Sequence, residues 1–177
     1  MNLKMIRALF FLPGMALAVL FYAGICDEAL AASRDYGTYT NARFGYCVEY
    51  PGGLVAGEAP VNNDGRTFTS KDGKVSLTVY GSFNALERTM QESFASYLED
   101  YNKEGKKVTY KAGGEKWFVL SGLDGDRVFY IKTIRQKVDE SDIDATFIFY
   151  YPRSEKAKYD AMTARIAKTF KFVSKGL

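Results

Sequence analysis

Hydrophobic and polar residues alternate along several stretches of the chain, and each such stretch predicts a β-strand. The first runs from Phe44 to Tyr50, where Phe44, Tyr46, Val48 and Tyr50 share one face. Pro51-Gly52-Gly53 follows it and ends the strand. One face of this strand is therefore expected to pack against a core.

The same criteria predict six further strands, which are residues 66–70, 74–81, 106–111, 116–121, 127–137 and 143–151. Lys71-Asp72-Gly73 separates the first two, and Asp-Gly between alternating runs is typical of a hairpin. Residues 54–65 have turn-forming composition and are expected to be a loop. The run 143–151 is apolar on both faces, which predicts a central strand covered from both sides.

Two stretches repeat apolar residues at three- and four-residue spacing, which predicts two helices. Their stripes are Leu86, Met90, Phe94, Tyr97 and Tyr101, and then Tyr159, Met162, Ile166 and Phe170. We expect Asn84 to cap the first helix, with Glu87 as its reciprocal partner, and Gly105 to end it. We expect Ser154 to cap the second helix, whose basic end suits a helix C-terminus and carries Lys168, Lys171 and Lys175.

Short connections between successive strands favour antiparallel pairing, and the two amphipathic helices need a sheet face to cover. The sequence therefore predicts an α+β fold, with a single twisted antiparallel sheet of about six to eight strands and two helices packed on it.

The N-terminal segment has the pattern of a secretory signal peptide. Lys4 and Arg7 precede an apolar run over residues 8–25, and the small-x-small pattern of Ala29 and Ala31 follows it.

Cleavage after Ala31 would remove residues 1–31 as a signal peptide and leave residues 32–177 as one domain. An uncleaved membrane anchor and lipidation at Cys26 are the two alternatives for this segment. Export with cleavage predicts a periplasmic or secreted bacterial protein without a membrane span.

Composition excludes several classes of site. The 177 residues contain no histidine and two cysteines, and their formal net charge is +3. Catalytic triads with histidine and histidine-ligated zinc or haem are therefore excluded from this chain. After cleavage only Cys47 remains, so no intramolecular disulfide can form. Cys47 lies opposite the apolar face of its strand and is expected to be a buried, inert thiol, in a protein that is a monomer.

Residues 41–51 (NARFGYCVEYP) resemble the opening strand of PsbP/Mog1-like domains, and the stop at Tyr150-Tyr151-Pro152 and a terminal helix ending at Phe170 are similar too. The stretch Asn62-Asn63-Asp64-Gly65-Arg66-Thr67-Phe68 is similar to one shared by a set of small exported proteobacterial proteins. The resemblance covers most of residues 36–172. It implies an accessory or assembly factor rather than an enzyme, and its short motifs carry over no functional residue.

Cations cluster in two places, which are Lys103, Lys106, Lys107 and Lys111, and then Arg127, Lys132, Arg135 and Lys137. Arg135 and Lys137 point to the same side of their strand, with Arg127 in phase if the strand has no bulge. The second group is the candidate contact for an anion or partner, such as an envelope protein or an anionic envelope component. The alternative is a solvated surface of mixed charge. Nucleic acid is not an expected partner of an exported protein.

The densest carboxylate strings are Asp124-Gly125-Asp126 and residues 139–144, and both are expected to be turns or connections, because neither has a calcium-loop frame. Nucleophile-elbow and phosphate-loop motifs are absent from the sequence. We therefore expect no metal, no cofactor and no catalytic residue. The sequence favours a non-catalytic binding protein that uses an aromatic sheet edge or the 52–65 loop. The alternative is a small carboxylate- or lysine-based hydrolase of cell-wall or polysaccharide material.

Overall fold

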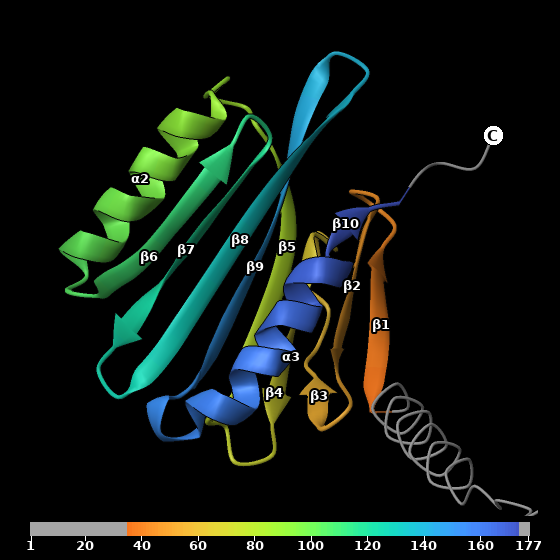
Figure 1. The fold of residues 1–177 in the computed structure, drawn as a ribbon. Coiled ribbons are helices and arrows are strands. Elements are labelled where there is room, and N and C mark those ends of the chain that lie inside the picture. The colour runs from red at the N-terminus through yellow and green to blue at the C-terminus, as the bar shows by residue number, and fades with distance from the viewer. Residues whose placement is uncertain (1–34, 174–177) are drawn as a thin grey trace, which may run out of the picture. The chain divides into compact units, whose positions relative to one another are not determined.

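The computed structural model describes residues 35–173. The predicted cleavage site at Ala29 and Ala31, the candidate lipidation site Cys26 and the basic residue Lys175 lie outside the described residues. The described part consists of two antiparallel sheets and two α-helices (Figure 1).

The larger sheet, called the main sheet below, has seven strands in the spatial order β3-β4-β5-β9-β8-β7-β6. Their bounds are Leu54–Ala56 (β3), Gly65–Ser70 (β4), Ser76–Phe83 (β5), Lys107–Gly114 (β6), Trp117–Asp124 (β7), Arg127–Val138 (β8) and Ser141–Pro152 (β9). Every neighbouring pair is antiparallel. The α+β class and the predicted antiparallel sheet are confirmed. The central position expected for residues 143–151 is also confirmed, because β9 lies between β5 and β8.

A second, smaller sheet of three strands was not predicted. It consists of β1 (Tyr36–Asn41), β2 (Tyr46–Pro51) and β10 (Lys171–Phe172), with β2 in the middle. The alternating run that begins at Phe44 thus belongs to this sheet and not to the main one. Its apolar face is nevertheless buried as expected, since Tyr46 and Val48 are fully buried.

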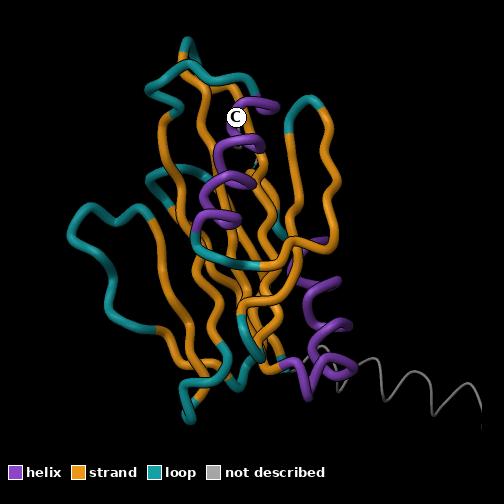
Figure 2. Tube along the Cα trace, turned by 90° about the vertical axis from the view of Figure 1, so that its left-hand side faces the viewer, coloured by secondary structure: helices purple, strands orange, loops and turns teal. Residues whose placement is uncertain are grey.

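The two helices lie on opposite faces of the main sheet, as Figures 1 and 2 show from two directions. Helix α2 (Met90–Lys103) covers an aromatic and aliphatic cluster that includes Phe118, Leu120, Phe129 and Ile131. Helix α3 (Lys156–Thr169), together with the small sheet, covers the larger core on the other face, which contains Phe68, Leu77, Val79, Phe147, Phe149 and Ile166. These two sides are called the α2 face and the α3 face below.

Both predicted helix starts are wrong. Helix α2 begins at Met90, and its cap is Thr89, which forms a reciprocal capping box with Glu92. Asn84 instead binds the backbone of Arg88 in the preceding loop. Ser154 lies in a short 3₁₀ turn, η1 (Arg153–Glu155), and α3 has no side-chain cap.

The predicted end of the first helix and the predicted hairpin turn are both confirmed. Gly105 ends α2 with a positive φ of 76°, a backbone conformation that glycine adopts at low cost. The turn at Asp72-Gly73 joins β4 to β5, and Gly73 likewise has a positive φ of 71°. Within residues 35–173, no helix is long and apolar enough to span a membrane.

Candidate functional site

The four cations proposed from the sequence all lie on β8, but they do not share one face. Side chains alternate along a strand, so Arg127, Arg135 and Lys137 belong to the α2 face and Lys132 to the α3 face. Arg127, Arg135 and Lys137 therefore point to the same side of the strand, as expected. The structure does not bring Lys132 together with them.

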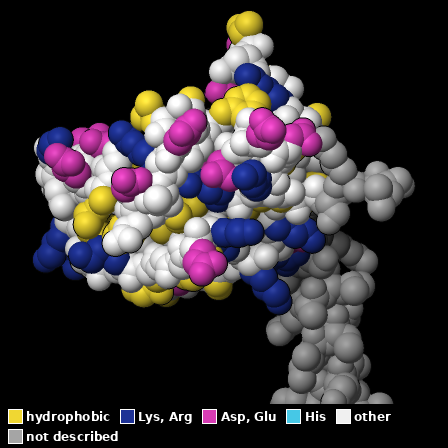
Figure 3. All heavy atoms as spheres, turned by 90° about the horizontal axis from the view of Figure 1, so that it is seen from above, with side chains coloured by type: hydrophobic (Ala, Val, Ile, Leu, Met, Phe, Trp, Pro, Cys, Tyr) yellow, Lys and Arg dark blue, Asp and Glu magenta, His cyan; other side chains and the backbone are white. Residues whose placement is uncertain are grey.

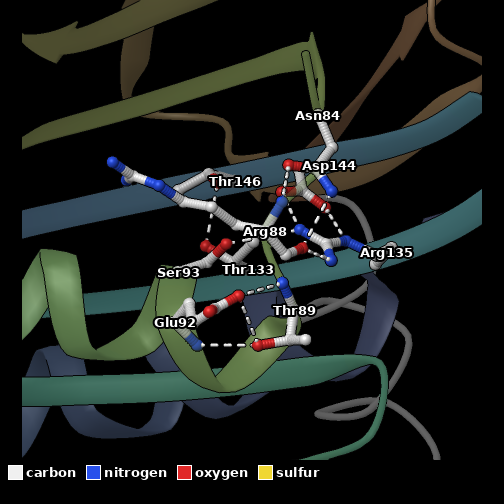
Figure 4. A network of polar contacts seen from close by, with 9 residues as sticks. All are labelled: Asn84, Arg88, Thr89, Glu92, Ser93, Thr133, Arg135, Asp144 and Thr146. Atoms are coloured by element: carbon white, nitrogen blue, oxygen red, sulfur yellow. Dashed lines mark hydrogen bonds and ion pairs between the residues drawn. The ribbon is translucent and has the colours of Figure 1, made fainter. Parts of the chain in front are cut away.

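Arg135 is held in an internal polar network (Figure 4). Its guanidinium forms two parallel hydrogen bonds to Asp144 of β9, at 2.6 and 2.7 Å, and the Arg135 side chain is only 8% exposed. The same group donates to the backbone oxygen of Arg88 and to the hydroxyl of Ser93. Arg135 therefore fixes the loop before α2 to the sheet, and four of its five N–H donors are used within the domain.

Lys132 has a structural partner on the other face. Its Nζ donates to the backbone oxygen of Ala167, near the C-terminal end of α3, at 2.7 Å. Burial lowers the pKa of this ammonium group. A cation at this place satisfies a carbonyl that the helix leaves unpaired.

Arg127 and Lys137 are more accessible. Arg127 pairs with Asp124 at 3.3 Å and lies over the ring of Tyr150. Lys137 is exposed next to the β8–β9 turn. The end of the domain that is seen from above in Figure 3 carries Lys and Arg side chains interspersed with Asp and Glu. Charge of mixed sign is the ordinary state of a protein surface.

The carboxylate strings form turns, as expected. Asp124 and Asp126 flank the β7–β8 turn, and residues 139–144 form the β8–β9 turn with the start of β9. Glu87, Glu140 and Asp142 line an open hollow of about 480 Å³ beside this turn. Among the described residues, no group of acidic side chains or cysteine is arranged to hold a metal ion.

The most distinctive hollow lies on the α3 face, where strands β6, β7 and β8 extend beyond the cover of α3. It has a volume of about 450 Å³, and its aromatic and charged lining residues are Tyr110, Tyr130, Tyr151, Lys156 and Asp160. We call these five residues and the space between them the tyrosine groove. Its volume falls within the range of about 300–1,000 Å³ that is typical of small-ligand sites.

A β-bulge places Tyr110 in this groove. The β6–β7 register shifts between Val108 and Tyr110, so Tyr110 pairs with Ser121 and faces the α3 side, whereas Val108 packs in the α2 cluster. Without the bulge, residues two apart would point the same way. A side chain at Gly122 would collide with the backbone oxygen of Lys107, so only glycine permits this close approach. The bulge leaves Tyr110 55% exposed.

Helix α3 supplies the charged wall of the groove. Lys156 donates to Oδ2 of Asp160, one helical turn away, and the hydroxyl of Tyr151 donates to Oδ1 at 3.0 Å. Burial raises the pKa of Tyr151 to about 12, and burial also raises the pKa of Tyr130. Both phenols are therefore neutral at physiological pH.

Two solved structures resemble this arrangement of strands and helices. Cyanobacterial PsbP (CyanoP) from Synechocystis aligns with a TM-score of 0.57 at 13% identity, over 78% of this chain and 92% of that chain. The Ran-binding protein Mog1p of Saccharomyces cerevisiae aligns with a TM-score of 0.52 at 11% identity, over 78% and 95%. The fold is PsbP/Mog1-like. No protein-family model matches the sequence, and a search of curated proteins also finds no match.

The PsbP/Mog1-like fold was expected from the sequence, but the tyrosine groove was not. Its residues come from β6, β8, β9 and α3, so no local sequence motif predicts the groove. A bulge on β6 is not visible in the run Lys107-Val108-Thr109-Tyr110-Lys111, which alternates without interruption. At identities of 11–13% the likeness concerns the fold alone, and the groove is therefore argued from its own residues.

The expected burial of Cys47 is wrong. Cys47 is half-buried. Glu49 of the same strand is also half-buried, and it accepts a hydrogen bond from Arg165 of α3 at 2.6 Å.

Proposed function

We propose that the protein is an exported, non-catalytic accessory or binding protein of the bacterial envelope, periplasmic or secreted, that contacts an envelope protein or an anionic envelope component. The observation that carries this proposal is the composition of the tyrosine groove. Of the described residues that line it, Asp160 is the one carboxylate, and both of its oxygens already accept hydrogen bonds. Hydrolysis of a glycosidic bond uses two carboxyl groups about 5–9.5 Å apart. The groove therefore suits binding rather than that chemistry.

Lys132 and Arg135 form hydrogen bonds within the domain. In this proposal Arg127 and Lys137 are therefore the residues of β8 that contact an anion or a partner. Mog1p is described as a Ran-binding protein, which is compatible with a binding role for a domain of this fold. We also propose a monomer without a cofactor.

Export is tested by the mass of the protein recovered from the periplasm of a Gram-negative host. The proposal expects a chain that begins at Ala32, within a residue or two. A mass that retains the apolar segment 8–25 contradicts cleavage, and added lipid mass on Cys26 identifies a lipoprotein instead.

Binding is tested by affinity capture from envelope extract with the recovered protein. Tyr110→Ala removes an exposed ring from the groove, and Phe83→Ala is a matched control, since Phe83 is 54% exposed at the far end of β5. The proposal expects captured material that Tyr110→Ala or a double Arg127→Ala/Lys137→Ala variant loses and Phe83→Ala keeps. Capture that none of these changes affects contradicts it.

The hydrolase alternative has one observation in its favour, the hollow lined by Glu87, Glu140 and Asp142. It predicts release of reducing ends from peptidoglycan or polysaccharide, abolished by Glu140→Gln or Asp142→Asn. The proposed binding function expects no release by the unmodified protein.

A further inference from the structure

The tyrosine groove offers an aromatic surface beside polar groups. The ring of Tyr110 is 55% exposed, and Tyr130 is half-buried on the neighbouring part of the floor. Aromatic rings carry negative charge on their faces, and they attract the weakly positive C–H groups of a flat ligand. The floor therefore suits a ligand with one C–H-rich face.

Three hydroxyl groups on the wall of the groove donate their protons to partners within the domain. Tyr151 donates to Asp160 at 3.0 Å, Ser121 donates to the backbone oxygen of Phe129 at 2.8 Å, and Thr163 donates to that of Tyr159 at 2.8 Å. Toward the groove these three oxygens keep only their acceptor lone pairs. Asp160 is an acceptor as well. The wall therefore favours a ligand that is rich in hydrogen-bond donors.

The charges of the groove select against ions. Lys156 and Asp160 form a pair, so the wall is neutral as a whole. An ammonium ligand over the tyrosines would meet Lys156, and an anion would meet Asp160, so each would lie beside a like charge. A proline-rich peptide, the other common occupant of aromatic grooves, presents carbonyl acceptors and few donors, which matches this wall poorly.

We propose that the tyrosine groove binds a neutral carbohydrate, with one sugar ring packed on Tyr110 and Tyr130 and its hydroxyls donating to Asp160, Tyr151 and Ser121. A sugar combines a C–H-rich face with many O–H donors, which are the two properties that the floor and the wall require. This inference rests on the proposed binding function and names the class of ligand for the same site. Lys156 remains a donor for a ring or hydroxyl oxygen.

The inference is tested with neutral oligosaccharides and the periplasm-recovered protein. Triacetylchitotriose, cellotriose and maltotriose are titrated by calorimetry and by saturation-transfer NMR, with a polyproline peptide and tetramethylammonium as competing probes. We expect at least one oligosaccharide to bind, and Tyr110→Ala to weaken it about five-fold, as is typical of one aromatic contact. Asp160→Asn keeps the shape but weakens the acceptor, and we expect a similar loss. Phe83→Ala should bind like the unmodified protein.

Three results would overturn the inference. One is the absence of oligosaccharide binding up to about 10 mM, the weakest affinity that is useful to such a site. Another is binding that Tyr110→Ala and Asp160→Asn leave unchanged, and the third is preferential binding of the peptide or of tetramethylammonium. If capture from envelope extract still depends on Tyr110 or on the Arg127/Lys137 pair in any of these cases, the carbohydrate assignment fails and the proposed binding function stands. If oligosaccharide binding fails and capture from envelope extract depends on none of these residues, both the carbohydrate assignment and the proposed binding function are rejected.

Discussion

Arg135 of β8 and Asp144 of β9 form a two-hydrogen-bond ion pair on the α2 face, with side chains 8% and 15% exposed. The pair is cross-strand, since these two residues are register partners. The hydrogen bonds to Asp144 raise the pKa of the Arg135 guanidinium further above its ordinary value. The same guanidinium reaches the loop before α2, so one side chain connects two strands, a loop and a helix (Figure 4).

The first prediction follows from this pair. Asp144→Ala leaves a buried guanidinium without its carboxylate, and we expect the free energy of unfolding to fall by about 3 kcal/mol. Chemical denaturation monitored by circular dichroism measures the change. Lys137→Ala, an exposed cation on the same strand, is the control and should change stability by less than about 0.5 kcal/mol. Equal effects of the two substitutions would contradict a structural role for Arg135.

The second prediction separates the observed helix cap from the one expected from the sequence pattern. Thr89→Ala removes the hydroxyl that accepts from the backbone N–H of Glu92, and we expect a loss of about 1 kcal/mol. Ser154→Ala should be nearly neutral, because the N-cap position of α3 is Glu155 and no side chain caps this helix. Thermal or denaturant unfolding of the two variants compares them directly. A larger loss from Ser154→Ala would show that α3 depends on that hydroxyl after all.

The third prediction concerns the thiol of Cys47. Because Cys47 is half-buried, we expect a thiol reagent to label it in the native protein, more slowly than in denaturant. Peptide mass spectrometry distinguishes this label from one on Cys26. Complete resistance of Cys47 until denaturation would mean that another surface covers it.

The fourth prediction concerns alkaline pH. The folded state raises the pKa of Tyr151 to about 12, whereas an unfolded tyrosine titrates near 10. The folded state therefore holds more protons than the unfolded state in this window, and the stabilising contribution is complete below about pH 10 and is lost as the pH rises toward 12. Tyr151→Phe should reduce the loss of stability between these pH values, measured by denaturation at each pH. An unchanged pH dependence in the variant would show that Tyr151 is not a source of it.

Local pattern was sufficient for most of the fold. Alternation located the strand around Tyr46, a run that is apolar on both faces located the strand around Phe147, and Asp72-Gly73 located a hairpin. Each of these signals acts over a few residues. The start of α2 was misplaced because Leu86 continues the apolar spacing of the helix. In the structure Leu86 is 72% exposed in a loop, which Asn84 and Arg135 hold through the backbone of Arg88.

Features that depend on contacts distant in sequence were not accessible to the same reasoning. Lys132 lies under α3 and Arg135 lies beside Asp144, and both positions depend on tertiary packing. As a result, neither cation is part of the exposed basic surface that the sequence predicted. The tyrosine groove depends on a one-residue bulge on an edge strand. Such a bulge changes which side of a sheet a residue faces without changing the composition of the strand.

The two-residue strand β10 has a consequence for the order in which the domain can assemble. Lys171 and Phe172 pair with Cys47 and Tyr46, so the small sheet joins segments from opposite ends of the described chain. A ribosome delivers the N-terminal side first, so β2 cannot pair with β10 until nearly all of the described residues have emerged. Contacts of such long sequence separation form slowly, because the intervening chain must first be closed into a loop. The small sheet can therefore acquire its third strand only near the end of synthesis.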